Sequence, residues 1–206
     1  MSASAEVFDQ SLIDSQRRVL WMVLILNAVM FPVELIAGLW SQSTALLADS
    51  ADMLGDAIVY GTSLYVLTRG ECNKAYNALL KGGVMLLFGC FIFIQAINKI
   101  IDPVIPSAET MGVVGMLALL VNISCFVLLM RHRSQDINMR SVWLCSRNDV
   151  VANMAVIIAG LLVYLLSSHW PDVIVGMALA GLFLMTALQI FRQAFEIIRA
   201  KKLQRV

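Results

Sequence analysis

The chain has 206 residues, of which 60% are hydrophobic and only 14% are charged. A soluble domain is typically about 45–50% apolar and about 25% charged, so this composition predicts a polytopic membrane protein. The net charge of +1 says nothing about partners, and no stretch of the sequence resembles a surface that binds nucleic acid. The four cysteines have neither CxxC spacing nor the spacing of a secreted scaffold, which argues against a disulfide framework.

Six segments are long and apolar enough to cross a bilayer, because a transmembrane helix needs roughly 20 mainly apolar residues. We expect an all-α fold of six transmembrane helices, at Val19–Trp40, Thr44–Leu67, Tyr76–Ile101, Met111–Leu129, Met139–Leu166 and Pro171–Ile198. The organisation that follows is a cytoplasmic N-terminal segment at 1–18, a transmembrane domain at 19–198 and a short basic tail at 199–206. Residues 1–18 do not have the pattern of a cleavable signal peptide.

Basic residues gather at both ends of the chain and at alternate connections: Arg17, Arg18, Arg69, Lys74, Lys81, Arg131, Arg133, Arg140, Arg199, Lys201, Lys202 and Arg205. The connections at Ser41–Ser43 and Ser168–Trp170 carry no Lys or Arg, and the one at Asp102–Thr110 is acidic. By the positive-inside rule, both termini are expected in the cytoplasm. The expected location is the cell membrane, the inner membrane in a bacterial host.

The stretch Leu46–Gly61 places three aspartates, Asp49, Asp52 and Asp56, in a segment that otherwise suits a bilayer. An ionised carboxylate near the bilayer centre is costly, and such residues normally line an ion path or a binding site. Asp52 and Asp56 are four residues apart and therefore share a helix face. Because two carboxylates repel each other at low dielectric, this face predicts a site for a metal ion, for protons, or for both in turn.

The fifth segment supplies a second polar stripe, in which Cys145, Asp149 and Asn153 again follow i, i+4 spacing. At 1.5 Å per residue, Asp52 and Asp149 each lie roughly 12–15 Å from the surface where their helices start, near the middle of the bilayer. Asp56 and Cys145 would then pair nearer the cytoplasm. The two stripes predict a tetrahedral metal site of Asp52, Asp56, Cys145 and Asp149.

Other polar residues within the helices belong to the surroundings of this site or to its pathway. Asp49 fits a route for protons or cations and fits helix packing equally well. Glu34 and Asn27 fit interhelical hydrogen bonds better than metal ligation. Asn122 and Asn153 fit a shell that orients the metal ligands.

Two further points concern residues near the predicted ligands. Arg147 either extends to the cytoplasmic surface or neutralises an acid, and the sequence does not decide between these. Cys72, Cys90 and Cys125 have no acidic partner at i, i+4 spacing, so we interpret them as packing residues.

Residues with a fixed order and spacing cover almost the whole chain: Asn27, Phe31, Glu34, Gly38, Ser43, Ala45, Asp49, the DMLGD motif at 52–56, Asn122, Asn138, Arg140, Ser141 and Asp172. In this arrangement the chain resembles the membrane domain of the cation diffusion facilitator transporters. The family motif in helix two is His or Asp, three residues, then Asp, which Asp52 and Asp56 match. The motif in helix five is similar, and there Cys145 replaces the usual residue while Asp149 matches.

The resemblance implies proton-coupled metal efflux by alternating access, and a homodimer. It also implies, for many members, a cytosolic metal-binding domain after the sixth helix. Only about eight residues follow the sixth predicted helix here, so we expect the membrane domain alone. The histidine-rich cytoplasmic loop of some members is absent from the sequence, where the corresponding loop has only His132.

Three carboxylates and one thiolate argue against Mg²⁺ and Ca²⁺, which favour all-oxygen shells. The set suits Zn²⁺ first and Cd²⁺ or Co²⁺ next, and keeps Fe²⁺ and Mn²⁺ open. All four ligands must lose their protons to bind, so metal binding releases protons and protons can displace the metal. We therefore expect a transporter rather than an enzyme, with the metal ion as cargo and no resident cofactor. The alternative is a non-transporting membrane protein that uses the same site as a sensor or assembly element.

Overall fold

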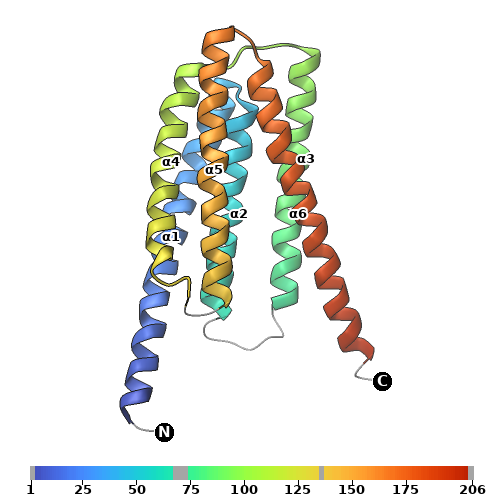
Figure 1. Ribbon diagram of the computed structural model, residues 1–206. Helices are drawn as coiled ribbons and strands as arrows, with labels where there is room; N and C mark the ends of the chain where they lie inside the picture. The colour runs from blue at the N-terminus through green and yellow to red at the C-terminus, as the bar shows by residue number, and fades with distance from the viewer. Residues whose placement is uncertain (1–2, 67–73, 135–136, 204–206) are drawn as a thin grey trace.

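The computed structural model describes residues 3–66, 74–134 and 137–203, which form a bundle of six helices (Figure 1). In chain order these are α1 (Ala3–Ser41), α2 (Thr44–Val66), α3 (Lys74–Ile101), α4 (Ala108–Met130), α5 (Ile137–Leu166) and α6 (Trp170–Leu203). The predicted all-α fold with six helices is confirmed. Both termini lie at one end of the bundle, here called the terminal end, and the opposite end is called the far end (Figure 1).

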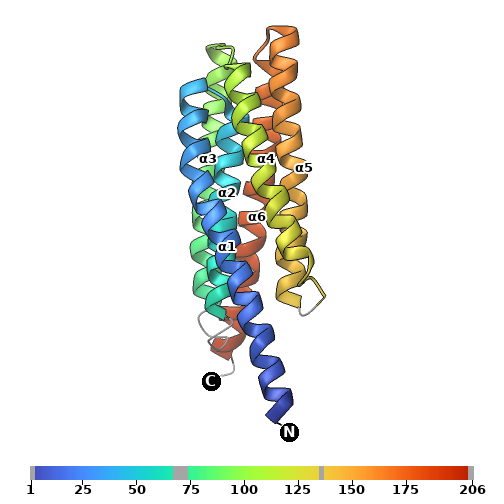
Figure 2. The ribbon, with the colours of Figure 1, turned by 90° about the vertical axis from the view of Figure 1, so that its left-hand side faces the viewer.

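The first and last helices are longer than predicted. α1 begins at Ala3 rather than near Val19, and α6 continues to Leu203. These polar extensions, 3–18 and 199–203, contain no Gly or Pro, so nothing in the backbone chemistry ends the helix where the apolar residues stop. Figure 2 shows the N-terminal part of α1 extending beyond its neighbours at the terminal end.

Within the described residues, five helices are long and apolar enough to cross a membrane by length and composition, and α2 is not among them. The reason is its three aspartates, which lower its hydropathy. α2 instead contacts α1, α3, α5 and α6, and none of its side chains from Thr44 to Tyr65 is exposed. The surrounding helices present large exposed apolar side chains, such as Val29, Leu120 and Leu161. The fold is a polytopic membrane bundle in which the aspartate-containing α2 is covered by other helices.

Two glycines allow other helices to approach α2 near the far end. A Cβ atom on Gly38 of α1 would lie 3.0 Å from Leu47, and one on Gly176 of α6 would lie 2.7 Å from Thr44 Oγ1. The second distance is shorter than any ordinary contact, so only glycine fits at that position. These contacts fix the start of α2 against α1 on one side and α6 on the other.

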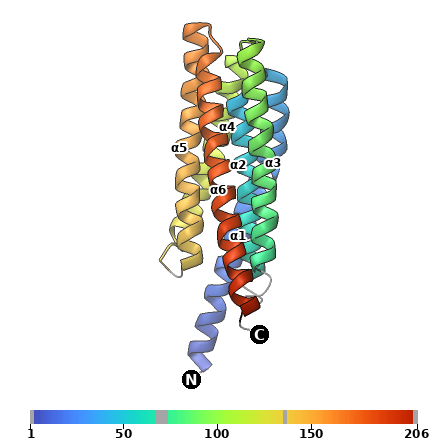
Figure 3. The ribbon, with the colours of Figure 1, turned by 90° about the vertical axis from the view of Figure 1, so that its right-hand side faces the viewer.

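Apolar clusters lie on both sides of the polar middle of the bundle. Toward the terminal end, Leu20 of α1, Tyr60 of α2 and Val142 of α5 belong to one cluster. Toward the far end, Leu46 and Val156 belong to another. Figure 3 shows α3 beside α6, and in Figure 1 α6 leans away from α5 toward the terminal end. The polar residues of α2 and α5 therefore lie between two apolar clusters.

Candidate metal centre

Three of the four predicted ligands come together between α2 and α5. One oxygen of Asp56, the sulfur of Cys145 and one oxygen of Asp149 all lie within 4.8 Å of one another. Both aspartates are buried and the cysteine is half-buried. The Cys145 thiol donates a hydrogen bond to Asp56 Oδ1 at 3.4 Å. These three residues, here called the inner cluster, offer oxygen and sulfur donors to one small cation.

Asp149 carries an oxygen that receives no hydrogen bond from the described residues. Its Oδ2 atom is buried and has no hydrogen-bond partner among the described residues. An unsatisfied buried oxygen is costly unless a proton or a cation reaches it. The inner cluster therefore has both the donor atoms and the need for a positive charge.

Asp52, the fourth predicted ligand, lies one helical turn from Asp56 toward the far end and is half-buried. Its carboxyl group interacts electrostatically with those of Asp149 and Asp49. The structure places Asp52 beside the inner cluster and outside the group of three whose ligand atoms converge. The four-ligand site stays a prediction.

Tyr60 contacts the inner cluster and was not predicted. Its hydroxyl group donates a hydrogen bond to Asp56 Oδ2 at 2.9 Å, and the side chain is fully buried. This bond holds one oxygen of Asp56 and leaves Oδ1 turned toward Cys145. Tyr60 follows Asp56 by four residues, so the spacing that relates Asp52 to Asp56 also indicates it, one turn further along.

Asn153 joins the inner cluster to Asp49. Its Nδ2 group donates to Asp49 Oδ1 at 2.9 Å and to the backbone carbonyl of Asp149 at 3.1 Å. It therefore touches the backbone of a cluster residue rather than its carboxylate. Asp49 is buried, and its second oxygen has no partner among the residues in the described ranges.

The other predicted polar residues differ in their surroundings. Asn27 donates to the carbonyl of Val23 at 2.8 Å and to Cys125 Sγ at 3.6 Å, so it links α1 to α4. Asn122 is buried in α4. Glu34 is fully buried, and neither of its carboxylate oxygens has a hydrogen-bond partner in the described part of the chain. The hydrogen bonds expected of Glu34 are thus not found there, and the carboxylates of Asp49 and Asp52 repel it.

Arg147 and the remaining cysteines lie away from the inner cluster. Arg147 is exposed and donates a hydrogen bond to Asn148 Oδ1 at 3.4 Å, which favours the surface position over neutralisation of an acid. Cys125 is buried beside Asn27, and Cys90 is exposed. Cys72, predicted to be a packing residue, lies outside the described residues.

Comparison with known proteins covers almost the whole transmembrane region. The model of the cation efflux transmembrane domain matches residues 20–198. The chain belongs to the cation efflux family.

Relatives in this family are named as metal transporters. The probable zinc transporter MSC2 of Saccharomyces cerevisiae is 30% identical over 207 residues, covering 90% of this chain and 28% of that protein. The cadmium, cobalt and zinc/H(+)-K(+) antiporter of Bacillus subtilis is 23% identical over 200 residues, covering 89% of this chain and 64% of that protein. The zinc transporter ZitB of Pectobacterium atrosepticum is 28% identical over 188 residues, covering 84% and 58%. The chain thus spans less than two thirds of each of these relatives.

Another buried aspartate of this cation efflux protein, Asp172, has a very different environment at the far end. Asp172, in the first turn of α6, accepts hydrogen bonds from the backbone N–H groups of Thr44 (2.9 Å) and Ala45 (3.1 Å), at the start of α2. It also accepts from Ser43 Oγ at 2.5 Å and Thr44 Oγ1 at 2.7 Å. A carboxylate here satisfies free N–H groups and complements the positive end of the helix dipole.

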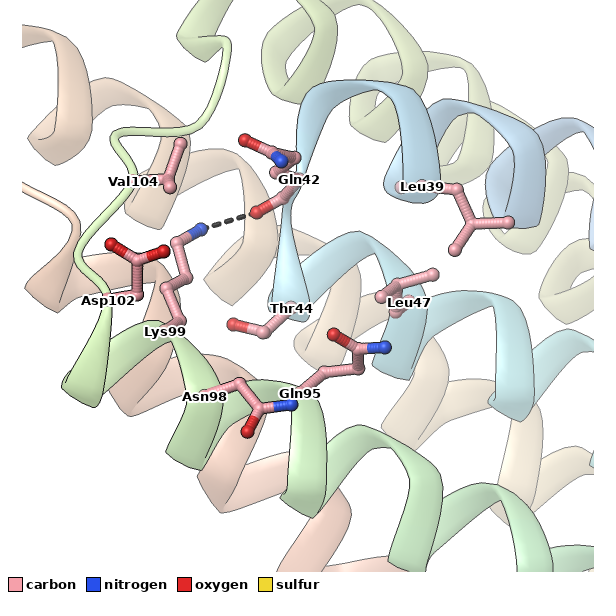
Figure 4. Close-up of a pocket in the computed structure, with 10 residues that line it drawn as sticks. Leu39, Gln42, Thr44, Leu47, Gln95, Asn98, Lys99, Asp102 and Val104 are labelled. Atoms are coloured by element: carbon pink, nitrogen blue, oxygen red, sulfur yellow. Dashed lines mark hydrogen bonds between the residues drawn. The ribbon is translucent and has the colours of Figure 1, made fainter.

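Lys99 of α3 completes this arrangement. Its ammonium group lies 2.8 Å from Asp172 Oδ2, and both side chains are buried. The same group donates to the backbone carbonyl of Gln42, as Figure 4 shows. We call the contacts of Asp172 with Lys99, Ser43, Thr44 and Ala45 the far-end anchor. It joins α2, α3 and α6, and the sequence alone did not indicate it.

A cavity of about 270 Å³ lies beside the far-end anchor. Figure 4 shows Gln42, Gln95, Asn98, Lys99 and Asp102 around it, so its polar lining comes from the end of α3 and the α1–α2 turn. The Lys99 ammonium group at its edge is already engaged by Asp172 and Gln42. The cavity is therefore a polar recess of the far end and carries no acid cluster like that of α2 and α5 among its lining residues.

Proposed function

We propose that the chain exports divalent transition-metal ions from the cytoplasm, Zn²⁺ first and Cd²⁺ or Co²⁺ next, in exchange for protons. The observation that carries this proposal is the inner cluster, where Asp56, Cys145 and Asp149 bring three ligand atoms within 4.8 Å of one another inside the bundle. Asp52, one turn away and electrostatically coupled to Asp149, is the fourth ligand. The names of relatives as zinc transporters and as a cadmium, cobalt and zinc antiporter support the same class of cargo.

The donor set explains the preferred ion. Carboxylate oxygens with one thiolate suit a small, borderline-soft cation at tetrahedral geometry, as Zn²⁺ is. A thiolate also binds the softer Cd²⁺ well. Mg²⁺ and Ca²⁺ require more oxygen ligands than the inner cluster provides.

The hydrogen bond from Cys145 to Asp56 supports exchange with protons. The thiol donates its proton toward Asp56 Oδ1 at 3.4 Å, and a metal ion at this position must replace that proton. Metal binding therefore releases protons, and protons arriving from the other side displace the metal. Exchange follows from the fact that the same atoms hold either cargo.

The arrangement of the helices supports loading of the metal ion from the terminal end. By the positive-inside rule, this end is expected to face the cytoplasm. α6 leans away from α5 toward this end, whereas the far-end anchor holds α2, α3 and α6 together at the other (Figure 1). Cys145, the half-buried member of the cluster, also lies nearer the terminal end than Asp149. Export requires this relation to reverse, so that the site opens at the far end.

The test is Zn²⁺ uptake into proteoliposomes with an imposed proton gradient, comparing the full chain with Asp149→Asn. Asp102→Asn is the matched control, since it makes the same chemical change at an exposed acid near the far end. The proposal predicts gradient-driven uptake in the wild type and the control, and none with Asp149→Asn. If the protein binds Zn²⁺ but neither the wild type nor the variants take it up, the result would instead indicate a membrane sensor. Uptake by Asp149→Asn at the wild-type rate would refute the proposed site.

A further inference from the structure

Unsatisfied buried oxygens continue beyond the inner cluster toward the far end. Glu34 is 0% exposed and both of its carboxylate oxygens lack hydrogen-bond partners among the described residues. Asp49 is 1% exposed, and one of its carboxylate oxygens lacks a hydrogen-bond partner among these residues. Asn153 is 0% exposed, and its side-chain carbonyl oxygen also lacks one. Four oxygen atoms on three buried side chains are therefore available to a ligand.

These three side chains come from different helices and belong to one neighbourhood. Asn153 of α5 donates to Asp49 of α2 at 2.9 Å. The carboxylate of Glu34 of α1 is repelled by those of Asp49 and Asp52 of α2. One turn beyond Glu34, the close contact of Gly38 with Leu47 holds α1 against α2. The packing that brings α1 onto α2 thus also brings the Glu34 carboxylate toward Asp49.

The group lies between the inner cluster and the far end. Asn153 follows Asp149 by one turn in α5, which runs toward the far end, and Asp49 precedes Asp52 and Asp56 in α2, which runs away from it. A cation that leaves the inner cluster toward the far end therefore meets Asp49, Asn153 and Glu34 next.

Leaving these oxygens without a positive charge is energetically unfavourable. An ionised carboxylate taken out of water without a partner costs several kcal/mol, and two that face each other cost more. The chain shows elsewhere how it satisfies a structural acid, since Asp172 has Lys99 and four hydrogen bonds from the start of α2. Nothing comparable reaches Glu34 within the described structure, so its carboxylate is suited to an exchangeable cation.

We propose that Glu34, Asp49 and Asn153 form a second binding site for the transported divalent cation, which the ion occupies on its way from the inner cluster to the far end. This inference rests on the proposed function. The second site has only oxygen donors and lacks the thiolate of Cys145, so it binds Zn²⁺, Cd²⁺ or Co²⁺ more weakly. A strong site facing the loading side followed by a weaker site facing the exit favours release.

Cobalt distinguishes the two sites because a thiolate ligand gives Co²⁺ an intense near-ultraviolet charge-transfer band and oxygen ligands do not. The experiment measures total Co²⁺ bound to the purified full chain by equilibrium dialysis and records the absorption spectrum of the same samples. The wild type should bind two ions per chain, one of them with the charge-transfer band. Glu34→Gln should bind one ion and keep the band, and Cys145→Ser should lose the band.

Asp102→Asn is the matched control and should bind as the wild type does. Thermal unfolding checks the fold of Glu34→Gln. Its melting temperature should not be below that of the wild type, because the change removes an unpaired buried charge. Two ions bound to Glu34→Gln, or a single ion with the charge-transfer band in the wild type, would overturn the second site and leave the inner cluster standing. Absence of the band from the wild type would instead contradict the proposed function.

Discussion

The far-end anchor and the inner cluster both bury aspartates in the same bundle, and the chain satisfies the two groups differently. Asp172 has a lysine, two hydroxyl groups and two backbone N–H groups for its two oxygens. Asp149 has a buried oxygen without a hydrogen-bond partner among the described residues, although it lies against Asp56 and Cys145. Under the proposed function, the difference separates a structural acid, which its own chain neutralises, from a functional acid, which requires a charge from outside.

The strongest way to break this comparison is to remove the charge of a functional acid. Asp56→Asn should abolish gradient-driven Zn²⁺ uptake, since it takes a ligand out of the inner cluster, and should lower the melting temperature by less than the same change at Asp172, since no buried counter-charge loses its partner. Uptake into proteoliposomes and thermal unfolding in detergent measure the two effects. If this variant loses as much stability as the one at Asp172 and still transports Zn²⁺, Asp56 is a structural acid rather than a functional one.

The same substitution at the structural acid should have the opposite result. Asp172→Asn leaves Lys99 buried without its counter-charge, so we expect it to lower the stability of the bundle by about 3–5 kcal/mol. Thermal unfolding measures this loss, with the exposed Asp102→Asn as a control that should show none. Changing Lys99 to Met in the Asp172→Asn background should recover part of it, and failure to recover any would mean that the ion pair is not the cause.

A smaller effect is expected where the chain only orients a functional acid. Tyr60→Phe removes the hydrogen bond to Asp56 Oδ2 while keeping the ring in its apolar cluster. Loss of such a supporting bond typically weakens metal affinity by about 10–100-fold. Isothermal titration with Zn²⁺ measures the change, and an affinity equal to that of the wild type would show that Tyr60 does not hold the carboxylate.

The smallest expected effect concerns the choice of ion rather than its transport. Cys145→His keeps a metal ligand at the same position of α5 but replaces sulfur with nitrogen. Transport of Zn²⁺ should therefore persist while the preference shifts away from Cd²⁺. Competition between the two ions in the uptake assay provides the measurement. If the preference did not change, sulfur would not be a ligand of the transported ion.

The parts of this account that the sequence could predict depend on local spacing. Hydropathy indicated six helices, and i, i+4 spacing placed Asp56 on the same face as Asp52 and Cys145 on the same face as Asp149. Depth along two antiparallel helices then predicted that these faces meet. The geometry of single helices is sufficient to predict each of these features.

The parts that the sequence could not predict depend on how distant helices pack. The hydrogen bonds of Asp172 to Ser43 and Thr44 join residues 129 and 128 positions apart, and its ion pair with Lys99 spans 73 positions. The close approach at Gly176 that makes them possible leaves no periodic pattern in the sequence. Glu34 was expected to form interhelical hydrogen bonds. The sequence of α1 alone does not show that two acids of α2, Asp49 and Asp52, act on its carboxylate.

The central claim is that the inner cluster binds the metal through both oxygen and sulfur, and X-ray absorption at the zinc edge tests it most directly. With the purified chain loaded with one Zn²⁺ per molecule, the account predicts one sulfur neighbour at about 2.3 Å together with oxygen neighbours at about 2.0–2.2 Å. The sulfur signal should disappear in Cys145→Ser, while the oxygen neighbours remain. A zinc shell without sulfur in the wild type, or one that Cys145→Ser leaves unchanged, would contradict the assignment of the site.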